Sequence, residues 1–142
     1  MKNYSVFDII GPRMTGPSSS HTAGAARLAL VARHIAHSDV TDVHFVLYGS
    51  FAETGKGHGT DKALIAGALG MEPDDPNIKN AYQIAREQGV LVSVEFSDAP
   101  TEHPNTARID ITGTSGAHTV VVGVSVGGGN ILITEINGLG VE

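Results

Sequence analysis

Residues 106–136 read TARIDITGTSGAHTVVVGVSVGGGNILITEI, and this stretch decides the fold class. It contains three runs rich in β-branched residues, at residues 106–112, 118–126 and 130–136. Glycine-rich turns at residues 113–116 and 127–129 separate the runs, so each has the length of an ordinary strand. Strands joined by such short turns pair with their neighbours along the chain. The stretch therefore predicts an antiparallel meander.

The residues before the meander predict three helices and two more strands. Apolar residues recur at helical spacing in each helical segment and alternate in each strand. Serine or threonine, aspartate, proline and glycine stand at the helix ends, where their capping and chain-breaking properties favour them. The predicted helices are residues 22–37, about 60–69 and 75–89, and the predicted strands are residues 42–48 and 90–96. Residues 49–59 are expected to be a glycine-rich connection.

This pattern predicts a single α+β domain over residues 1–142, with a mostly antiparallel sheet of about five strands packed against about three helices. The chain is long enough to bury a substantial core. It contains no internal repeat, linker or low-complexity tract.

Composition excludes several classes of protein. Hydrophobic residues make up 41% and charged residues 17%, which excludes a disordered chain. The net charge of -6 excludes a general nucleic-acid footprint, and no apolar run approaches the roughly 20 residues of a membrane span. The first residues lack the apolar core of a signal peptide, so we expect a cytoplasmic protein. The chain has no cysteine, which excludes a disulfide framework and a thiolate-held metal cluster within it.

The segment GPSSSHTAG, residues 16–24, places five hydrogen-bonding side chains directly before the first predicted helix. Free backbone N–H groups and the positive end of the helix dipole attract an anion at such a place. Ser18, Ser19, Ser20 and Thr22 would add hydroxyl donors, and His21 would add a proton carrier. A carboxylate or phosphate fits this description. The alternative is that one serine caps the helix and the others occupy a turn.

A second segment, GKGHGTD at residues 55–61, holds His58 between two glycines. It lacks the spacing of a Walker phosphate loop, so the nucleotide interpretation fails. A neutral histidine is the side chain best suited to proton abstraction near physiological pH. The alternative is a flexible turn with a bystander histidine. The sequence shows no HExxH metal motif, EF-hand loop or GxSxG elbow.

Four segments resemble a known family along essentially the whole chain. They are IGPRMTGPSSSHTAGAARLA (10–29), LYGSFAETGKGHGTDKALIAGALG (47–70), HPNTARI (103–109) and VSVGGGNILITEING (124–138). Together they resemble the β chain of bacterial iron–sulfur-dependent L-serine dehydratase. The same type of domain is similar to the allosteric substrate-binding domain of some D-3-phosphoglycerate dehydrogenases.

The resemblance implies deamination of L-serine to pyruvate and ammonia without pyridoxal phosphate. It also implies that a partner α chain holds a [4Fe-4S] cluster through its cysteines, which agrees with their absence from this chain. This chain is then expected to be inactive without its α chain, and a homodimer of the isolated domain is an open option. No nucleic-acid or membrane partner is expected.

The resemblance, together with the residue chemistry, assigns expected roles in the site. His58 is expected to be the general base, with His21 and His118 orienting the substrate or carrying protons. The substrate carboxylate is expected to be held by hydroxyl side chains at the helix start, and Asn105 to hydrogen-bond the substrate or fix a loop. The expected substrate-binding residues are Ser18, Ser19, Ser20, Thr22 and Asn105.

Two-chain members of this family commonly continue into an ACT domain, whereas this sequence runs only to Glu142, directly after ITEING. We therefore expect no ACT domain in these residues, which puts regulation by an ACT ligand in doubt. A different class of function also remains open, namely a non-catalytic module that binds a small carboxylate or phosphate. His58 separates the two, because a pure anion sensor is better served by lysine or arginine. A third option, an interaction scaffold, predicts an exposed apolar patch.

Overall fold

The fold is known from a computed structural model that describes residues 20–37, 39–54, 59–101, 103–127 and 130–140. One mixed sheet has the strand order β2-β1-β3-β4-β5-β6. Its strands are β1 (Val40–Tyr48), β2 (Leu91–Ser97), β3 (Thr106–Gly113), β4 (His118–Gly127), β5 (Asn130–Ile136) and β6 (Leu139–Gly140). Five of these six strands were predicted, and the short β6 was not. The predicted α+β fold class is confirmed.

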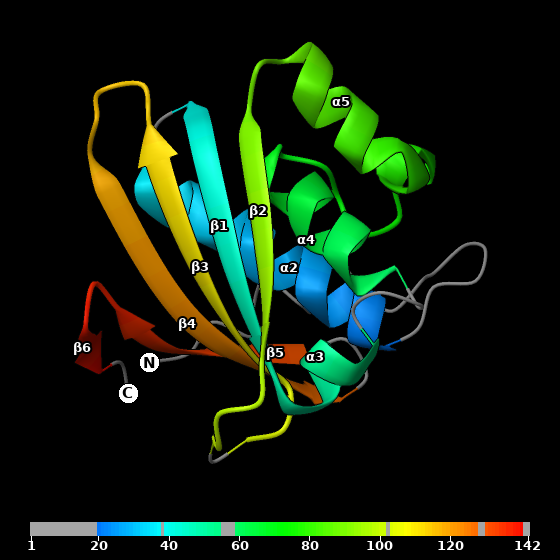
Figure 1. Cartoon of the computed structure of the whole chain (residues 1–142), viewed down its shortest axis with the longest axis vertical. Coiled ribbons are helices and arrows are strands. Elements are labelled where there is room, and N and C mark those ends of the chain that lie inside the picture. The colour runs from blue at the N-terminus through cyan, green and yellow to red at the C-terminus, as the bar shows by residue number, and fades with distance from the viewer. Residues whose placement is uncertain (1–19, 38, 55–58, 102, 128–129, 141–142) are drawn as a thin grey trace.

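The predicted meander is confirmed, because β3, β4 and β5 pair antiparallel in chain order. β1 lies between β3, which it pairs antiparallel, and β2, which it pairs parallel. A parallel pair needs a long crossover between its strands. The helical segment between Tyr48 and Leu91 supplies this crossover and returns the chain to the sheet beside β1 (Figure 1).

The helical elements are α2 (Ser20–Ala36), α3 (Gly49–Thr54), α4 (Thr60–Ala68), the 3-10 helix η1 (Pro76–Asn80) and α5 (Ala81–Glu87). The predictions for α2 and α4 hold to within two residues. The third predicted helix forms as η1 followed by α5, and Asp75 caps it by accepting a 2.8 Å hydrogen bond from the backbone N–H of Asn77. The prediction of a plain connection at residues 49–59 was wrong over its first half, where α3 forms around the fully buried Phe51.

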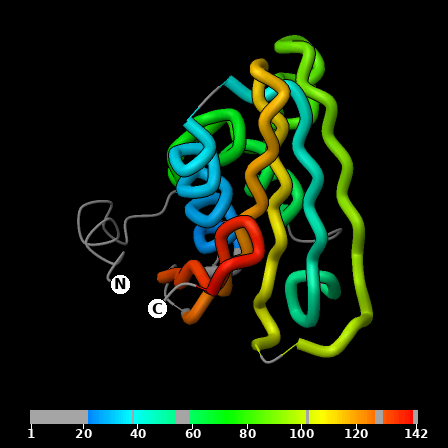
Figure 2. The backbone as a smooth tube through the Cα atoms, turned by 90° about the vertical axis from the view of Figure 1, so that its left-hand side faces the viewer, coloured from blue at the N-terminus to red at the C-terminus, as the bar shows by residue number. Residues whose placement is uncertain are grey.

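The helices lie on one side of the sheet, as Figure 2 shows from the side. Alternate strand residues point toward them, and the largest fully buried side chains include Phe45, Leu47, Ile109 and Ile111 from the sheet and Leu28 from α2. The other side of the sheet, called the open face below, is not covered by any of the described helices. None of these helices is both long and apolar enough to cross a membrane.

Candidate functional site

Helices α2 and α4 pack side by side and run in the same direction. A Cβ added at Gly59, before α4, would lie 3.8 Å from Cγ2 of Thr22 in the first turn of α2. Eleven residues further along both segments, a Cβ added at Gly70, just after α4, would lie 3.4 Å from Nε of Arg33 near the end of α2. Because residue numbers increase in the same direction along both helices from one contact to the next, the two helices are parallel. The N-terminal ends of α2 and α4 therefore lie next to each other.

Small residues allow the two helices to approach this closely. A Cβ added at Gly67 would lie 2.8 Å from Cβ of Ala29 and still closer to the carbonyl oxygen of Ala26. Real Cβ atoms essentially never approach other atoms so closely, so the backbones touch at this point. Glycine at position 67 thus fixes the separation of the two helices, and with it the separation of their N-terminal ends.

Parallel helices add their dipoles, so this arrangement has an electrostatic consequence. Each helix carries about half a positive charge at its N-terminus and half a negative charge at its C-terminus. At the C-terminal end the guanidinium of Arg33 donates a 3.0 Å hydrogen bond from Nη1 to the carbonyl oxygen of Ala68. At the N-terminal end, the first turn of α2 contains no acidic residue. The paired N-termini are therefore a region that favours an anion.

The one acidic residue in the first turn of α4, Asp61, is held by hydrogen bonds of its own. Its Oδ1 accepts from the backbone N–H of Lys62 at 2.8 Å, and its Oδ2 accepts from the hydroxyl of Tyr82 at 2.6 Å. Burial, together with this bond and the negative charge of Asp61, raises the pKa of Tyr82. The tyrosine therefore stays protonated and keeps the carboxylate tied toward α5.

Thr60, the first residue of α4, is the most unusual polar residue at this end. It is fully buried, and its Oγ1 has no hydrogen-bond partner among the residues that the structure describes. The preceding residue, Gly59, adopts the left-handed conformation with φ 79° and offers no side-chain cap. A buried hydroxyl without a partner costs about 1–3 kcal/mol, and such groups call for a functional or structural explanation.

The end of β4 places a further polar side chain against the first turns of α2, on the side of this helix that faces the sheet. Ser125 is 3% exposed, and its Oγ would lie 2.5 Å from a Cβ added at Gly24 in α2. The backbone N–H of Ser125 donates a 2.9 Å hydrogen bond to the carbonyl oxygen of Asn105. The candidate site is therefore the N-terminal ends of α2 and α4 together with Ser125 and Asn105.

The predicted site residues other than His118 divide into three groups. Thr22 and Asn105 lie at the candidate site just described. Ser20 and His21 form the first turn of α2 in their backbone, but their side chains lie outside the described part. Ser18, Ser19 and His58 lie outside the described residues altogether, so their predicted roles stay predictions.

The structure does not bring His118 to this group. It is the first residue of β4, whereas Ser125 is near the end of that strand, roughly 23 Å away at the usual rise per residue. The odd separation also places the two side chains on opposite faces of the sheet. His118 is exposed on the open face, with Nδ1 3.2 Å from Oγ1 of Thr112 and 3.4 Å from Oδ1 of Asp110. Its predicted role in the same site therefore gains no support from its position.

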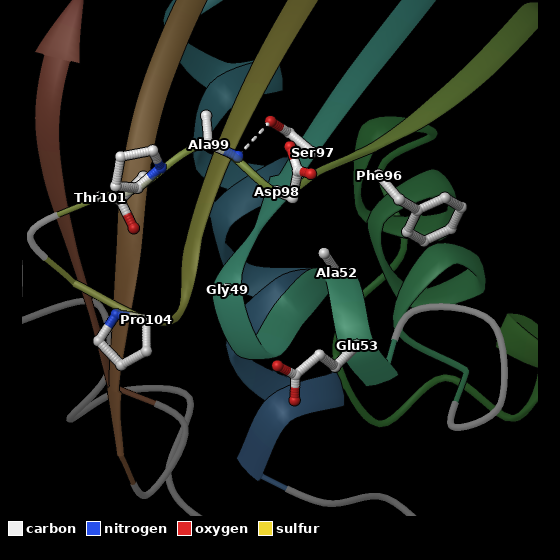
Figure 3. Close-up of a pocket in the computed structure, with 10 residues that line it drawn as sticks. Gly49, Ala52, Glu53, Phe96, Ser97, Asp98, Ala99, Thr101 and Pro104 are labelled. Carbon is white, nitrogen blue, oxygen red and sulfur yellow. Dashed lines mark hydrogen bonds between the residues drawn. The ribbon is translucent and has the colours of Figure 1, made fainter.

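A hollow of about 580 Å³ lies between α3 and the segment that follows β2 (Figure 3). Its charged lining residues, Glu53 and Asp98, are both carboxylates. Figure 3 also shows Ser97, whose Oγ accepts a 3.1 Å hydrogen bond from the backbone N–H of Ala99. None of the predicted site residues lines this hollow. Its two negative charges make it unsuited to the expected anion.

Comparison with known proteins identifies the family. The sequence profile described as serine dehydratase beta chain matches residues 5–89, which contain α2, α4 and the glycine-rich segment between α3 and α4. This chain belongs to that family. The membership confirms the family resemblance that the sequence motifs indicated, whereas the likeness to the allosteric substrate-binding domain stays a prediction.

Individual relatives extend the match to the rest of the chain. The L-serine dehydratase beta chain of Peptoniphilus asaccharolyticus is 45% identical over the whole of this chain and 64% of its own length. The probable L-serine dehydratase beta chain of Bacillus subtilis (strain 168) is 52% identical over 97% of this chain and 62% of its own length. L-serine dehydratase 2 of Escherichia coli K12 is 46% identical over 52% of this chain and 17% of its own. This serine dehydratase beta chain homologue thus spans less than two thirds of the length of the two beta chains named above.

The residues present do not fit an iron–sulfur cluster. This chain has no cysteine, the usual cluster ligand. Within the described ranges, no three histidine or carboxylate side chains come together in a way that would hold a metal ion.

Two residues of the candidate site, Thr60 and Ser125, were not predicted from the sequence. Thr60 follows the glycine-flanked His58, and its position at the start of a helix was a usable signal. Ser125 interrupts the apolar core-facing side of β4, where Val121 is also buried. The alternation of residues in β4 places Ser125 on the core-facing side, and a polar residue at such a position could have been recognised as a candidate site residue.

Proposed function

We propose that this chain is the beta component of an L-serine dehydratase, which converts L-serine to pyruvate and ammonia. Two findings support the proposal: the family membership and the names of the relatives that align along the whole chain. The observation that carries it in the structure is the parallel packing of α2 and α4, which directs two helix N-termini at one place. A small carboxylate such as that of L-serine suits this place.

We propose that a [4Fe-4S] cluster is held by the cysteines of a partner α chain, and that pyridoxal phosphate takes no part in the reaction. The supporting observations are that the sequence has no cysteine and that no group of three metal-binding side chains forms among the described residues. The beta-chain name of the relatives implies a partner subunit for them.

The proposed contribution of this chain is to bind the substrate and move a proton. The Cα proton of serine is weakly acidic, because its removal places negative charge next to a carboxylate. Two helix N-termini aimed at that carboxylate stabilise the developing charge without rearranging. His58 accepts the Cα proton while the β-hydroxyl leaves, and the aminoacrylate that forms tautomerises and is hydrolysed to pyruvate and ammonia. Thr22 and Asn105 orient the substrate, with His21 as a helper. His118 takes part only if another surface of the assembly reaches the open face.

The function is tested by anaerobic co-expression with a cysteine-bearing α chain and an assay of pyruvate released from L-serine. We expect activity only when both chains are present. A cluster-loaded pair that assembles but releases no pyruvate would contradict the proposal. L-threonine assayed in parallel reports whether the site prefers a different hydroxy amino acid.

The substitution Thr60→Val is expected to raise stability while weakening substrate binding. Valine has the shape of threonine and removes the buried hydroxyl that lacks a partner in the described residues, so the free energy of unfolding should rise by about 1 kcal/mol. If the hydroxyl donates to the substrate, KM for L-serine should rise by roughly tenfold. Thermal unfolding of the chain and steady-state kinetics of the assembled enzyme measure the two effects.

The matched control is Thr60→Ser, which keeps the hydroxyl and should keep KM near its original value. A loss of stability in Thr60→Val would mean that the hydroxyl has a structural role. An unchanged KM in a more stable variant would remove Thr60 from the binding site but leave the proposed dehydratase activity intact.

The regulatory-module alternative keeps one observation in its favour. The described side chains at the candidate site, Thr22, Thr60, Asn105 and Ser125, are hydroxyls and an amide. They suit anion binding but include no acid or base for catalysis. Under this alternative, inorganic phosphate would alter the rate of the assembled enzyme without competing with L-serine, whereas a substrate site predicts simple competition.

A further inference from the structure

The open face of the sheet has an apolar centre with one cation and one anion on opposite sides of it. Val120, Val122, Val124 and Leu132 line a groove there, and Arg108 and Glu135 line the same groove. Leu132 is 46% exposed, as is Val126 further along β4. Figure 2 shows the described helices on the other side of the sheet only.

Arg108, Val122 and Glu135 form one row across three strands. Arg108 of β3 pairs with Val122 of β4, which pairs with Glu135 of β5. The register of β4 against β5 shifts between Val122 and Gly123, and this irregularity accompanies the placement of Glu135 on the open face beside Thr134. Two strand spacings separate the Cα atoms of Arg108 and Glu135, roughly 10 Å.

Neither charged side chain in this row has a partner within the described part of the chain. The ion pairs among the described residues involve Arg33, His44 and His118 with carboxylates, and none includes Arg108 or Glu135. No side-chain hydrogen bond joins either of them to another described residue. An arginine beside a half-buried valine and an exposed leucine is also a combination typical of interface centres.

We propose that the open face binds a second copy of this chain about a two-fold axis that passes over Val122. Such an axis, running along the strands, reverses the row, so Arg108 lies opposite the partner's Glu135 and Glu135 lies opposite the partner's Arg108. Each interface then contains the same ion pair twice, as an isologous contact requires. The valines and Leu132 of the two sheets pack between the pairs, in the aligned arrangement that is common for stacked sheets.

The charge pattern of the row favours a second copy over an unrelated partner. A cation and an anion at equal spacing on either side of Val122 are complementary to the same row turned around. The net charge of -6 makes two copies repel each other at long range, so the short-range pairing must supply orientation as well as attraction. The interface does not depend on the dehydratase activity.

The test uses sedimentation velocity of the chain over a concentration series, with the substitutions Arg108→Glu and Glu135→Arg. The unchanged chain is expected to form dimers. Each single variant should raise the dimer dissociation constant by about thirtyfold or more, because each homodimer then contains two pairs of like charge. An equimolar mixture of the two variants should dimerise again, since both pairs in the mixed dimer are of opposite charge.

Controls with the same change of net charge are Lys79→Glu and Glu87→Arg, both at exposed positions on the helical side. They should leave the dissociation constant unchanged, and circular dichroism checks that all variants fold. A chain that stays monomeric at all concentrations would overturn the proposal. A dimer that ignores both single variants, or a mixture that fails to dimerise, would also overturn it, and in these cases the open face is free for a different subunit.

Discussion

Replacing His58 by alanine in the assembled two-chain enzyme should lower kcat for L-serine by about a thousandfold. A positioned general base typically contributes a factor of roughly 10² to 10⁴. His58 stands between Gly57 and Gly59, and the latter lies next to Thr22 at the joined helix ends. The variant should assemble with its α chain as before. The measurement is kcat at saturating L-serine, together with the size and the iron content of the complex.

The matched control for this experiment is His34→Gln, which changes an exposed histidine in the last turn of α2. Its kcat should remain near that of the unchanged enzyme. Added imidazole should restore part of the activity of His58→Ala, because a free base can replace the missing one. Near-normal turnover in His58→Ala would exclude His58 as the base, whatever the effect on stability.

Gly67→Ala should lower the free energy of unfolding by about 3 kcal/mol. Alanine alone would stabilise an exposed helix by roughly 1 kcal/mol relative to glycine. Here its Cβ would meet the backbone carbonyl of Ala26 and the Cβ of Ala29, neither of which can move without shifting α2. Overpacking of this kind costs about 1–3 kcal/mol or more, and loss of the tight helix contact adds to it. The clash therefore outweighs the gain in helix propensity.

Thermal unfolding measures the effect, and the melting temperature should fall by roughly 10 °C. Gly140→Ala is the control, because a Cβ added at Gly140 meets no atom within 4 Å. The melting temperature of this control should change little. An unchanged or raised melting temperature in Gly67→Ala would show that α2 and α4 separate easily. The distance between their N-termini would then not be fixed by this contact.

Local chemistry predicted most of the elements correctly. The alternation of β-branched residues in 106–136 located three strands and their turns, because side chains on a strand alternate between its two faces. Asp75 and Gly89 marked the limits of a helical segment through capping, which depends on only a few neighbouring residues. The wrong prediction of a connection where α3 forms also came from relying on local residue preferences. Glycine at position 49 and a glycine-rich segment after it favoured a loop, whereas burial of Phe51 against the sheet gave a helix.

The candidate site could be predicted only in part. The hydroxyl-rich start of α2 predicted an anion-binding site, because its side chains and its helix dipole both depend only on residues close together in the sequence. Thr60 and Ser125 were missed because the importance of each depends on α2, which is distant in the chain. Thr22 of α2 lies beside Gly59 just before Thr60, and Gly24 of α2 lies against Ser125. His118 was grouped with the site by its residue type, although strand geometry places it at the far end of β4.

The sequence by itself determined every described helix and strand except α3 and the short β6, as well as the absence of thiolate ligands and the family, because these depend on residue types and their spacing. Only the tertiary structure decided that α2 and α4 run parallel with their N-termini together, and that β2 lies beside β1. The physical reason is that local periodicity selects the type of an element. Its neighbours are selected by contacts between residues far apart in the chain, such as Gly67 against Ala26 and Ala29.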